Sequence, residues 1–253
     1  MDCKECKMSK MVAIDKTAHK DICIDPLKVE GLGSDANMVP IVMTEFLKAA
    51  TRFPIVFTKN AETGRFSVIT LCGFEVGENL FYRAGAWDSL YVPLNILRQP
   101  FFLGSDDSAG EEQQVICLDV ESPCISDEGK PLFNENGDAE KYLKDMQTML
   151  AQLYHGEKTT RHFIETVNEF GLIQKMSLDI KFENGEAIKV QGIYTIDENK
   201  LNELPLEQFS TLRQNSMLFP IYSMIQSLGH IHWMVNQRNI RNEDAKGWFS
   251  KTS

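Results

Sequence analysis

The feature that most constrains the fold is an alternating pattern around Asn184-Gly185. Apolar Leu178, Ile180 and Phe182 alternate with polar residues before it, and Ile188 and Val190 resume the alternation after it. A period of two is typical of a strand with one buried face, and Asn-Gly favours a tight turn with positive φ. The sequence therefore predicts one β-hairpin over about 178–190, so the chain cannot be all helical.

Short strands and helices are predicted on both sides of this hairpin. Pro54–Thr58, Phe66–Phe74, Leu80–Tyr82 and Val115–Asp119 are rich in β-branched and aromatic residues. We expect an α+β fold in which a β-rich N-terminal half packs on a helical C-terminal half around a single continuous core. A chain of 253 residues with 43% hydrophobic content is long enough to bury such a core.

The helices are predicted from apolar spacing of three and four residues. One runs over Tyr142–Leu153 and is expected to stop at His155-Gly156, and a second runs from Thr159 to Phe170. The stretch Leu218–Asn236 is also predicted as one helix. It contains Pro220 and several polar residues, so it suits a protein core better than a membrane.

The domain organisation follows from composition. Residues 1–36 are expected to form an extended or partly disordered arm with a short strand at Ile22–Ile24, because they show little periodicity. Residues 37–240 are expected to form a single domain, with an internal seam at the acidic, Ser/Gly-rich stretch 104–114. Residues 241–253 are expected to be a C-terminal tail.

Charge and cysteine content limit the classes of partner and compartment. The net charge of −10 excludes a basic nucleic-acid surface, which needs clustered Lys and Arg. No segment predicts a secretory signal or membrane insertion. Six cysteines without an export signal favour the reducing cytoplasm.

Two motifs suggest metal or redox chemistry. Cys3 and Cys6 have C-x-x-C spacing, but zinc needs further ligands and a redox site needs a strand-to-helix setting, so a mobile tail is the simpler interpretation. His19 and Asp21 have the spacing that begins an iron-binding facial triad. A surface polar loop is the alternative for these two residues, and no cofactor is predicted.

His230 and His232 lie two residues apart on the predicted helix Leu218–Asn236. Residues two apart on a helix project about 200° from each other and cannot share an ion. The helical wheel places His232 on the apolar face, which predicts a hydrogen-bonded core histidine there, and His230 on the opposite side.

The richest candidate for binding is the stretch Gly73–Gly104, where aromatic residues, prolines and a few charged groups gather. If these side chains line one concavity, the aromatic rings supply contact area and the polar groups orient a ligand or partner. The alternative is that Trp87 and Phe101 are core, that Arg98 pairs with Glu78 and that Asn79 caps a turn. The candidate residues are Glu78, Asn79, Trp87, Tyr91 and Arg98.

The same region carries a resemblance to a known family. The ordered motifs are Val39-Pro-Ile, Glu45-Phe, Phe53-Pro-Ile-Val-Phe57, Gly77-Glu-Asn-Leu-Phe81, Trp87, Tyr91-Val-Pro93 and Arg98-x-Pro-Phe. Together with further matches downstream they make residues 19–236 resemble the SapC-like family, bacterial proteins named for a surface-layer locus. The peptide-transporter permease of the same name is a different protein with many membrane spans.

What this resemblance implies about function is an accessory role. Genes of the family tend to lie near those for flavin-dependent halogenases and cupin-like oxygenases. We therefore expect a non-catalytic binding protein that assists a peptide- or protein-modifying enzyme and has a protein or peptide partner. The alternatives are a metal-dependent (Fe or Zn) or oxygenase-like enzyme and a surface-layer structural protein, and the oligomeric state stays open.

Overall fold

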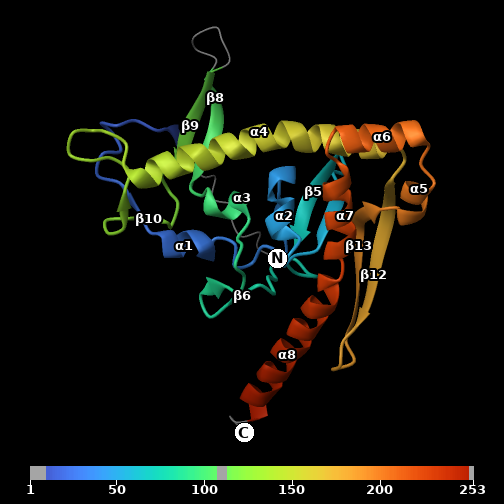
Figure 1. The fold of residues 1–253 in the computed structure, drawn as a ribbon. Helices are drawn as coiled ribbons and strands as arrows, with labels where there is room; N and C mark the ends of the chain where they lie inside the picture. The colour runs from blue at the N-terminus through green and yellow to red at the C-terminus, as the bar shows by residue number, and fades with distance from the viewer. Residues whose placement is uncertain (1–9, 107–112, 251–253) are drawn as a thin grey trace. The chain divides into compact units, whose positions relative to one another are not determined.

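The computed structural model describes residues 10–106 and 113–250 of the chain, the side chains of 105, 106, 113 and 244–250 excepted. Figure 1 shows its helices and strands as a ribbon. Its contacts divide the chain into two compact units. Unit 1 comprises Met1–Leu32 and Leu94–Tyr154, and unit 2 comprises Gly33–Pro93 and His155–Ser253. The mixture of helices and small sheets is the α+β class predicted from the sequence.

Unit 1 contains two three-stranded sheets and two short helices, together with the first part of a long helix. The first sheet has the order β1-β9-β8 and the second has the order β10-β2-β11. The bounds are β1 (Met11–Ala13), β2 (Cys23–Ile24), α1 (Pro26–Gly31), α3 (Leu94–Leu97), β8 (Phe101–Asp106), β9 (Gln113–Asp119), β10 (Ile125–Ser126), β11 (Lys130–Pro131) and α4 (Lys141–Glu169).

The core of unit 1 explains why residues 10–32 are part of the fold and not a separate arm. Ile24 and Val29 are buried against Phe101, Leu118 and Leu143. β1 pairs with β9, and β2 pairs with both β10 and β11. The expected strand at Ile22–Ile24 overlaps β2, whereas the burial of Val29 in α1 gives this segment more structure than its weak periodicity indicates.

Unit 2 is built on a five-stranded antiparallel sheet with the order β12-β13-β4-β5-β3. The helix α7 contacts α2 and the strands β4 and β13. The bounds are β3 (Met38–Pro40), the 3-10 helix η1 (Met43–Glu45), α2 (Phe46–Ala49), β4 (Ile55–Lys59), β5 (Phe66–Leu71), β6 (Tyr82–Arg83), β7 (Ala86–Trp87), β12 (Ile173–Lys181), β13 (Ala187–Ile196), α5 (Glu198–Asn202), α6 (Leu206–Gln214), α7 (Leu218–Ser227) and α8 (His230–Ser250).

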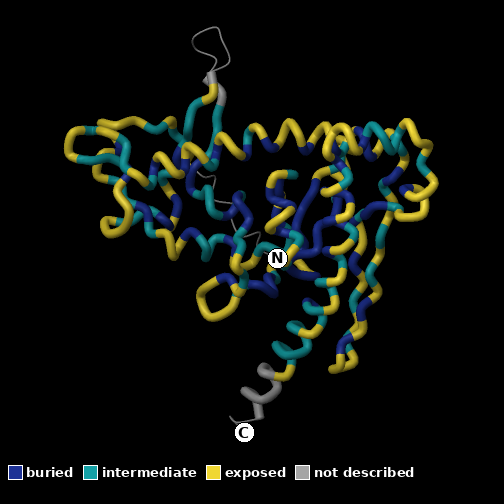
Figure 2. Tube along the Cα trace, viewed as in Figure 1, coloured by how far each residue is buried: buried dark blue, intermediate teal, exposed yellow. Residues whose placement is uncertain are grey.

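The hairpin predicted around Asn184-Gly185 is the β12–β13 pair, and it is longer than predicted. Gly185 has a φ of +88°, as a tight turn requires. Exposed residues recur along both strands in Figure 2, which reflects the alternation that the sequence shows.

Two helix boundaries differ from the sequence prediction. α4 runs without a break from Lys141 to Glu169, so Gly156 does not end a helix. A Cβ at Gly156 would lie 2.7 Å from Cγ2 of Val42, so this glycine serves close packing within unit 2.

The second difference is a break at Leu228-Gly229, which separates α7 from α8. This break changes the helical phase. His232 is therefore exposed, and the Nε2 of His230 lies 2.9 Å from the Ala50 carbonyl oxygen. The predicted roles of the two histidines were wrong because the helical wheel assumed one continuous helix.

The expected tail is also shorter than predicted. α8 continues through Arg241 to Ser250, and the Arg241 side chain contacts the body of unit 2. The expected seam at 104–114 coincides with the ends of β8 and β9 and with residues 107–112, which lie outside the described residues.

Candidate functional site

The structure places the five candidate residues in both units. Glu78, Asn79, Trp87 and Tyr91 lie in unit 2, within a segment that we call the 73–93 segment (Gly73–Pro93), whereas Arg98 lies in unit 1. The 73–93 segment has little regular structure, because β6 and β7 contain two residues each. Its conformation is therefore set by contacts outside a sheet.

The first of these contacts is a close backbone approach at Gly73. A Cβ at this position would lie 2.1 Å from the Glu78 carbonyl oxygen, so a side chain cannot be accommodated without a shift. The N–H groups of Cys72 and Gly73 both donate to the Asn37 carbonyl oxygen, at 2.7 and 3.0 Å. The Leu80 N–H donates to the Cys72 carbonyl oxygen at 2.8 Å, which closes the turn.

Asn79 fixes the next turn from inside the protein. Asn79 is only 2% exposed. The Nδ2 group donates to the Gly33 carbonyl oxygen at 2.7 Å, and Oδ1 accepts from the Phe81 N–H at 2.8 Å. Asn79 therefore caps a turn, as the alternative interpretation of the sequence holds.

Glu78 binds an arginine of α8. One carboxylate oxygen accepts from the Phe74 N–H at 2.8 Å, and the other accepts from Arg238. Arg238 also pairs with Glu75 at 2.8 Å and with Glu186 at 3.4 Å. Burial lowers the pKa of Arg238, but its hydrogen bonds and charge interactions with Glu78 and Glu75 outweigh burial and raise it overall.

A second arginine of α8 binds the backbone of the same segment. Nη2 of Arg241 donates to the carbonyl oxygens of Asn79 and Tyr82, at 2.8 and 3.0 Å. Burial lowers the pKa of this guanidinium. Arg238 and Arg241 are three residues apart on one helix face, which was the signal in the sequence that could have identified them as a pair.

Trp87 belongs to an aromatic cluster and not to an open surface. It is 7% exposed, and its ring centroid lies 6.1 Å from that of Phe53. The Phe53 and Phe81 rings lie 4.5 Å apart, and Phe81 stacks on Trp233 of α8 at 4.6 Å. Aromatic pairs at these separations stabilise the packing beyond their buried area.

Arg52 covers this aromatic cluster from the solvent side. Its guanidinium carbon lies 3.9 Å from the Trp233 ring centroid, a cation–π arrangement. Nε and Nη2 both donate to the Asp88 carbonyl oxygen, at 3.2 and 3.0 Å. Arg52 therefore fixes the chain just before Ser89 and Leu90.

Tyr91 donates its hydroxyl to a buried carboxylate. The distance from this hydroxyl to Oε1 of Glu45 is 2.5 Å, and Oε2 of Glu45 accepts from the Val42 N–H at 2.9 Å. Glu45 is 1% exposed. Burial, and then the charge and hydrogen bond of Glu45, raise the pKa of Tyr91, so the phenol stays protonated at neutral pH.

Two apolar side chains of the 73–93 segment are exposed, Val76 and Leu90. Leu90 is fully exposed, and it stands between Asp88, which Arg52 holds, and Tyr91, which Glu45 holds. Nζ of Lys48 lies 5.9 Å from the centre of the Tyr91 ring. We define Lys48, Arg52, Leu90 and Tyr91 as the Leu90 surface.

Arg98 contacts residues close to it in unit 1. Nε donates to Oδ1 of Asn95 at 2.9 Å, and Nη1 donates to the Phe101 carbonyl oxygen at 2.9 Å. The guanidinium carbon lies 4.3 Å from the centre of the Phe102 ring. Arg98 thus supports the entry into β8.

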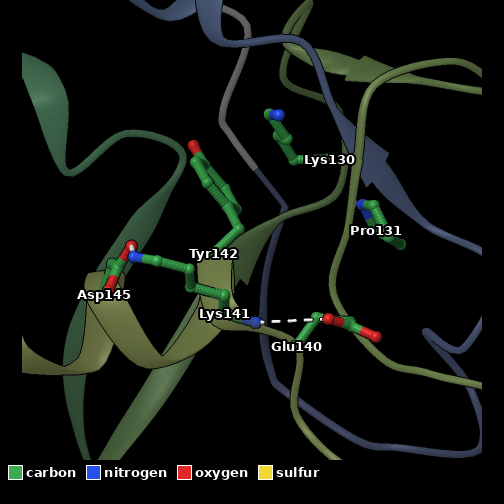
Figure 3. Close-up of a pocket in the computed structure, with 6 residues that line it drawn as sticks. All are labelled: Lys130, Pro131, Glu140, Lys141, Tyr142 and Asp145. Carbon is green, nitrogen blue, oxygen red and sulfur yellow. Dashed lines mark hydrogen bonds and ion pairs between the residues drawn. The ribbon is translucent and has the colours of Figure 1, made fainter.

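Unit 1 also contains a pocket of about 310 Å³ (Figure 3). Two of its charged residues pair with each other, since Nζ of Lys141 lies 2.6 Å from the Asp145 carboxylate. Burial, followed by the charge of Cys124, raises the pKa of Tyr142 to about 12, so its hydroxyl is a donor at neutral pH. The lining residues are Lys130, Pro131, Glu140, Lys141, Tyr142 and Asp145.

The two residues considered for iron do not form a metal site with other described residues. Nδ1 of His19 accepts from the Asp15 N–H at 2.9 Å, so His19 closes a local turn. The Asp21 side chain is 88% exposed. Within 10–106 and 113–250, no three His, Cys, Asp or Glu side chains gather as metal ligands.

The described cysteines are free thiols, namely Cys23, Cys72, Cys117 and Cys124. Cys72 is completely buried beside the 73–93 segment, and burial raises its pKa to about 12. Cys3 and Cys6 lie outside the described residues.

The comparisons with known proteins identify the family. Among the described helices, none is both long and apolar enough to cross a membrane. No curated protein and no solved structure matches the chain. A family model described as SapC matches residues 14–234, which is most of the chain. The chain therefore belongs to the SapC family.

Proposed function

We propose that this chain is a non-catalytic binding protein whose Leu90 surface contacts a protein or peptide partner. The observation that carries the proposal is the contrast between Leu90 and its surroundings. Leu90 is fully exposed, whereas Glu45, which holds the neighbouring Tyr91, is buried. An apolar side chain on a rigidly held loop is typical of a recognition site.

The chemistry around Leu90 indicates what the partner presents. Lys48 and Arg52 add positive charge, part of which is offset by the Asp88 carboxylate 3.5 Å from Arg52, and Tyr91 and the Trp233 ring add aromatic area. Arginine and aromatic residues are enriched where proteins bind one another. The surface suits an apolar side chain followed or preceded by a carboxylate.

We further propose that the partner is a peptide- or protein-modifying enzyme of the halogenase or oxygenase type, or its substrate, and that the chain acts in the cytoplasm. The accessory role rests on the SapC resemblance. The compartment is supported by the free thiols at Cys23, Cys72, Cys117 and Cys124. The net charge of −10 favours a protein over a nucleic acid.

The test compares Leu90→Asp with a control at a second exposed leucine of unit 2. Leu206 is 81% exposed and lies on α6, so Leu206→Asp makes the same chemical change elsewhere. Immobilised wild-type and variant proteins are incubated with lysate of the source cells, and bound proteins are quantified by mass spectrometry. We expect Leu90→Asp to lose a partner that wild type and Leu206→Asp retain.

The role of that partner is then tested with purified components. An accessory protein is expected to raise the rate at which the captured enzyme modifies its peptide, and Leu90→Asp is expected to lose this effect. Equal capture by all three proteins would refute the assigned surface. A captured enzyme whose rate does not change would refute the accessory role.

A further inference from the structure

The sheet of unit 2 ends in a strand with an open edge. β12 (Ile173–Lys181) is the terminal strand of the order β12-β13-β4-β5-β3, and β13 is its only strand partner in the described parts of the chain. It contains nine residues, none of them glycine or proline. A long regular edge strand presents a row of N–H and C=O groups to which another strand can pair.

The direction of these groups follows from the ladder. The Phe182 N–H donates to the Glu186 carbonyl oxygen, so Phe182 and Glu186 form a hydrogen-bonded pair. Such pairs alternate along an antiparallel ladder, so Ile180 and Leu178 also point their backbone groups toward β13. The backbone groups of Lys175, Ser177, Asp179 and Lys181 therefore point outward, at the edge.

The irregularity of the hairpin does not interrupt this edge. The register passes from Met176↔Ile193 to Leu178↔Val190, so the extra residue lies in β13. Gly192 of β13 has a φ of +79°, which suits a bulge. β12 itself keeps a strict alternation of its two faces.

The side chains of β12 follow the same alternation. On one face Lys175, Ser177, Asp179 and Lys181 are exposed. On the other face Met176 and Leu178 are half-buried, and Ile180 is buried. A strand added at this edge would extend both faces, so its own residues must match a polar face and an apolar face.

We propose that the added strand is β12 of a second copy of this chain, paired antiparallel about a twofold axis at Ser177. In this register Lys175 lies opposite Asp179 of the partner subunit, and the twofold axis repeats the pair. On the apolar face Met176 lies opposite the partner subunit's Leu178. Ser177 lies opposite its own copy.

Other registers that keep the outward-pointing groups paired over at least five residues of β12 lack this complementarity. The register centred on Ile180 places Lys181 opposite the partner's Asp179, but it overlaps only three residues of β12. A shift in one direction places Lys175 opposite the partner's Lys181, and a further shift places Asp179 opposite its own copy. A shift in the other direction places Lys175 opposite the partner's Ser177, without an ion pair. Opposite charges across a ladder stabilise it and like charges destabilise it, so the sequence of β12 selects the register centred on Ser177.

Charged residues on an edge usually prevent pairing with another strand. Here Lys175 and Asp179 have opposite charges, and each lies opposite the other when β12 pairs with its own copy. Asp179 already pairs with Lys189 of its own chain at 3.4 Å, and both side chains are more than half exposed. Lys175 of the partner would approach the same carboxylate from the other strand. The charges therefore discriminate between partners and do not block the edge.

The first test measures self-association by sedimentation equilibrium of the full chain at low ionic strength. We expect a dimer that weakens about tenfold in Lys175→Glu and in Asp179→Lys, since each change makes both ion pairs repulsive. The double variant Lys175→Glu/Asp179→Lys restores opposite charges and is expected to return to within about threefold of wild type.

The matched control is Lys181→Glu, on the same face of the same strand. In the proposed register Lys181 lies opposite Ile173 of the partner subunit, so its charge reversal is expected to change the dissociation constant less than about threefold. A monomeric wild type at about 100 µM would overturn the proposal, since this corresponds to association weaker than about 5.5 kcal/mol. A dimer that ignores the charge reversals would overturn it as well.

The second test fixes the register directly. Residues in a hydrogen-bonded antiparallel pair have Cα atoms about 5.5 Å apart, which a disulfide can span. Ser177→Cys is therefore expected to form a dimer under mild oxidation, with a disulfide between the two copies of position 177 identified by peptide mapping. Lys181→Cys is the control and is expected not to link to its own copy. Absence of the link at position 177 in a dimer would refute the register.

Discussion

The 73–93 segment and the β12–β13 hairpin, both in unit 2, satisfy their backbone and charged groups in opposite ways. The segment has almost no regular structure, yet its backbone and charged groups bind distant residues such as Asn37, Arg238 and Arg241. The hairpin is regular and satisfies its inner groups locally, but it leaves one edge open. Regular secondary structure therefore does not ensure that every backbone group has a partner. The rigidity of the 73–93 segment depends instead on residues far away in the sequence.

The largest expected effect is at Gly73. Its added Cβ would meet the Glu78 carbonyl oxygen at 2.1 Å, so Gly73→Ala must displace backbone in the closed segment. We expect the free energy of unfolding of unit 2 to fall by about 3 kcal/mol or more, measured by urea denaturation. A loss below about 1 kcal/mol would mean that the segment can relax and is not closed.

Removal of Arg238 is expected to have the next largest effect. The Glu78 and Arg238 side chains are 10% and 18% exposed, so Arg238→Ala leaves a mostly buried carboxylate without its main ion-pair partner. We expect a loss of about 2–3 kcal/mol in the same denaturation experiment.

The matched control for Arg238→Ala is in the hairpin. Lys189 pairs with Asp179, and their side chains are 55% and 71% exposed. Lys189→Ala is expected to cost less than about 0.5 kcal/mol, because exposed ion pairs contribute little. Similar losses in both variants would contradict the distinction between a closed and an open region.

Tyr91→Phe tests the segment through pH. The pKa of Tyr91 is raised in the folded state, because the fold favours the protonated phenol. The contribution of Tyr91 to the free energy of unfolding is therefore complete below the unfolded pKa of about 10. It is lost as the pH rises above 10. We expect Tyr91→Phe to cost about 2 kcal/mol at pH 7, because Glu45 loses a donor, and to show a shallower loss of stability between pH 9 and 11. Identical pH profiles would refute the buried Tyr91–Glu45 pair.

Apart from the Lys189→Ala control, the smallest effect is expected at the hairpin turn. A Cβ at Gly185 would contact nothing within 4 Å, so Gly185→Ala is opposed only by its φ of +88°. We expect a loss of about 1 kcal/mol by urea denaturation. Gly185→Asn tolerates this φ better and should recover part of that loss. Equal costs at Gly185 and Gly73 would remove the distinction between a strained turn and a backbone clash.

Local features were predictable from the sequence and distant ones were not. The Asn184-Gly185 hairpin depends on neighbouring residues, and it was predicted correctly. The turn cap at Asn79 was one of two interpretations of the sequence, and it too depends on a neighbouring residue, Phe81. The partner of Glu78 is instead Arg238, 160 positions along the chain, and no spacing rule connects such residues.

The errors at helix boundaries have the same cause. Gly156 resembles a stop signal unless the approach of Val42 is known, and the break at Leu228-Gly229 is invisible to a helical wheel. None of the five candidate residues is exposed, because each makes contacts inside its own unit. Leu90 was not among the candidates, because an exposed leucine looks the same in sequence as a buried one.

The buried thiol of Cys72 makes the closure of the 73–93 segment measurable in the intact protein. A thiol with a pKa of about 12 and no exposure is unreactive toward alkylating reagents until the surrounding structure opens. Cys72 is bonded through its backbone to Asn37 and Leu80, so its labelling rate follows the opening of this one segment. The chain thus carries its own kinetic probe, which can report whether a partner bound at Leu90 slows the opening.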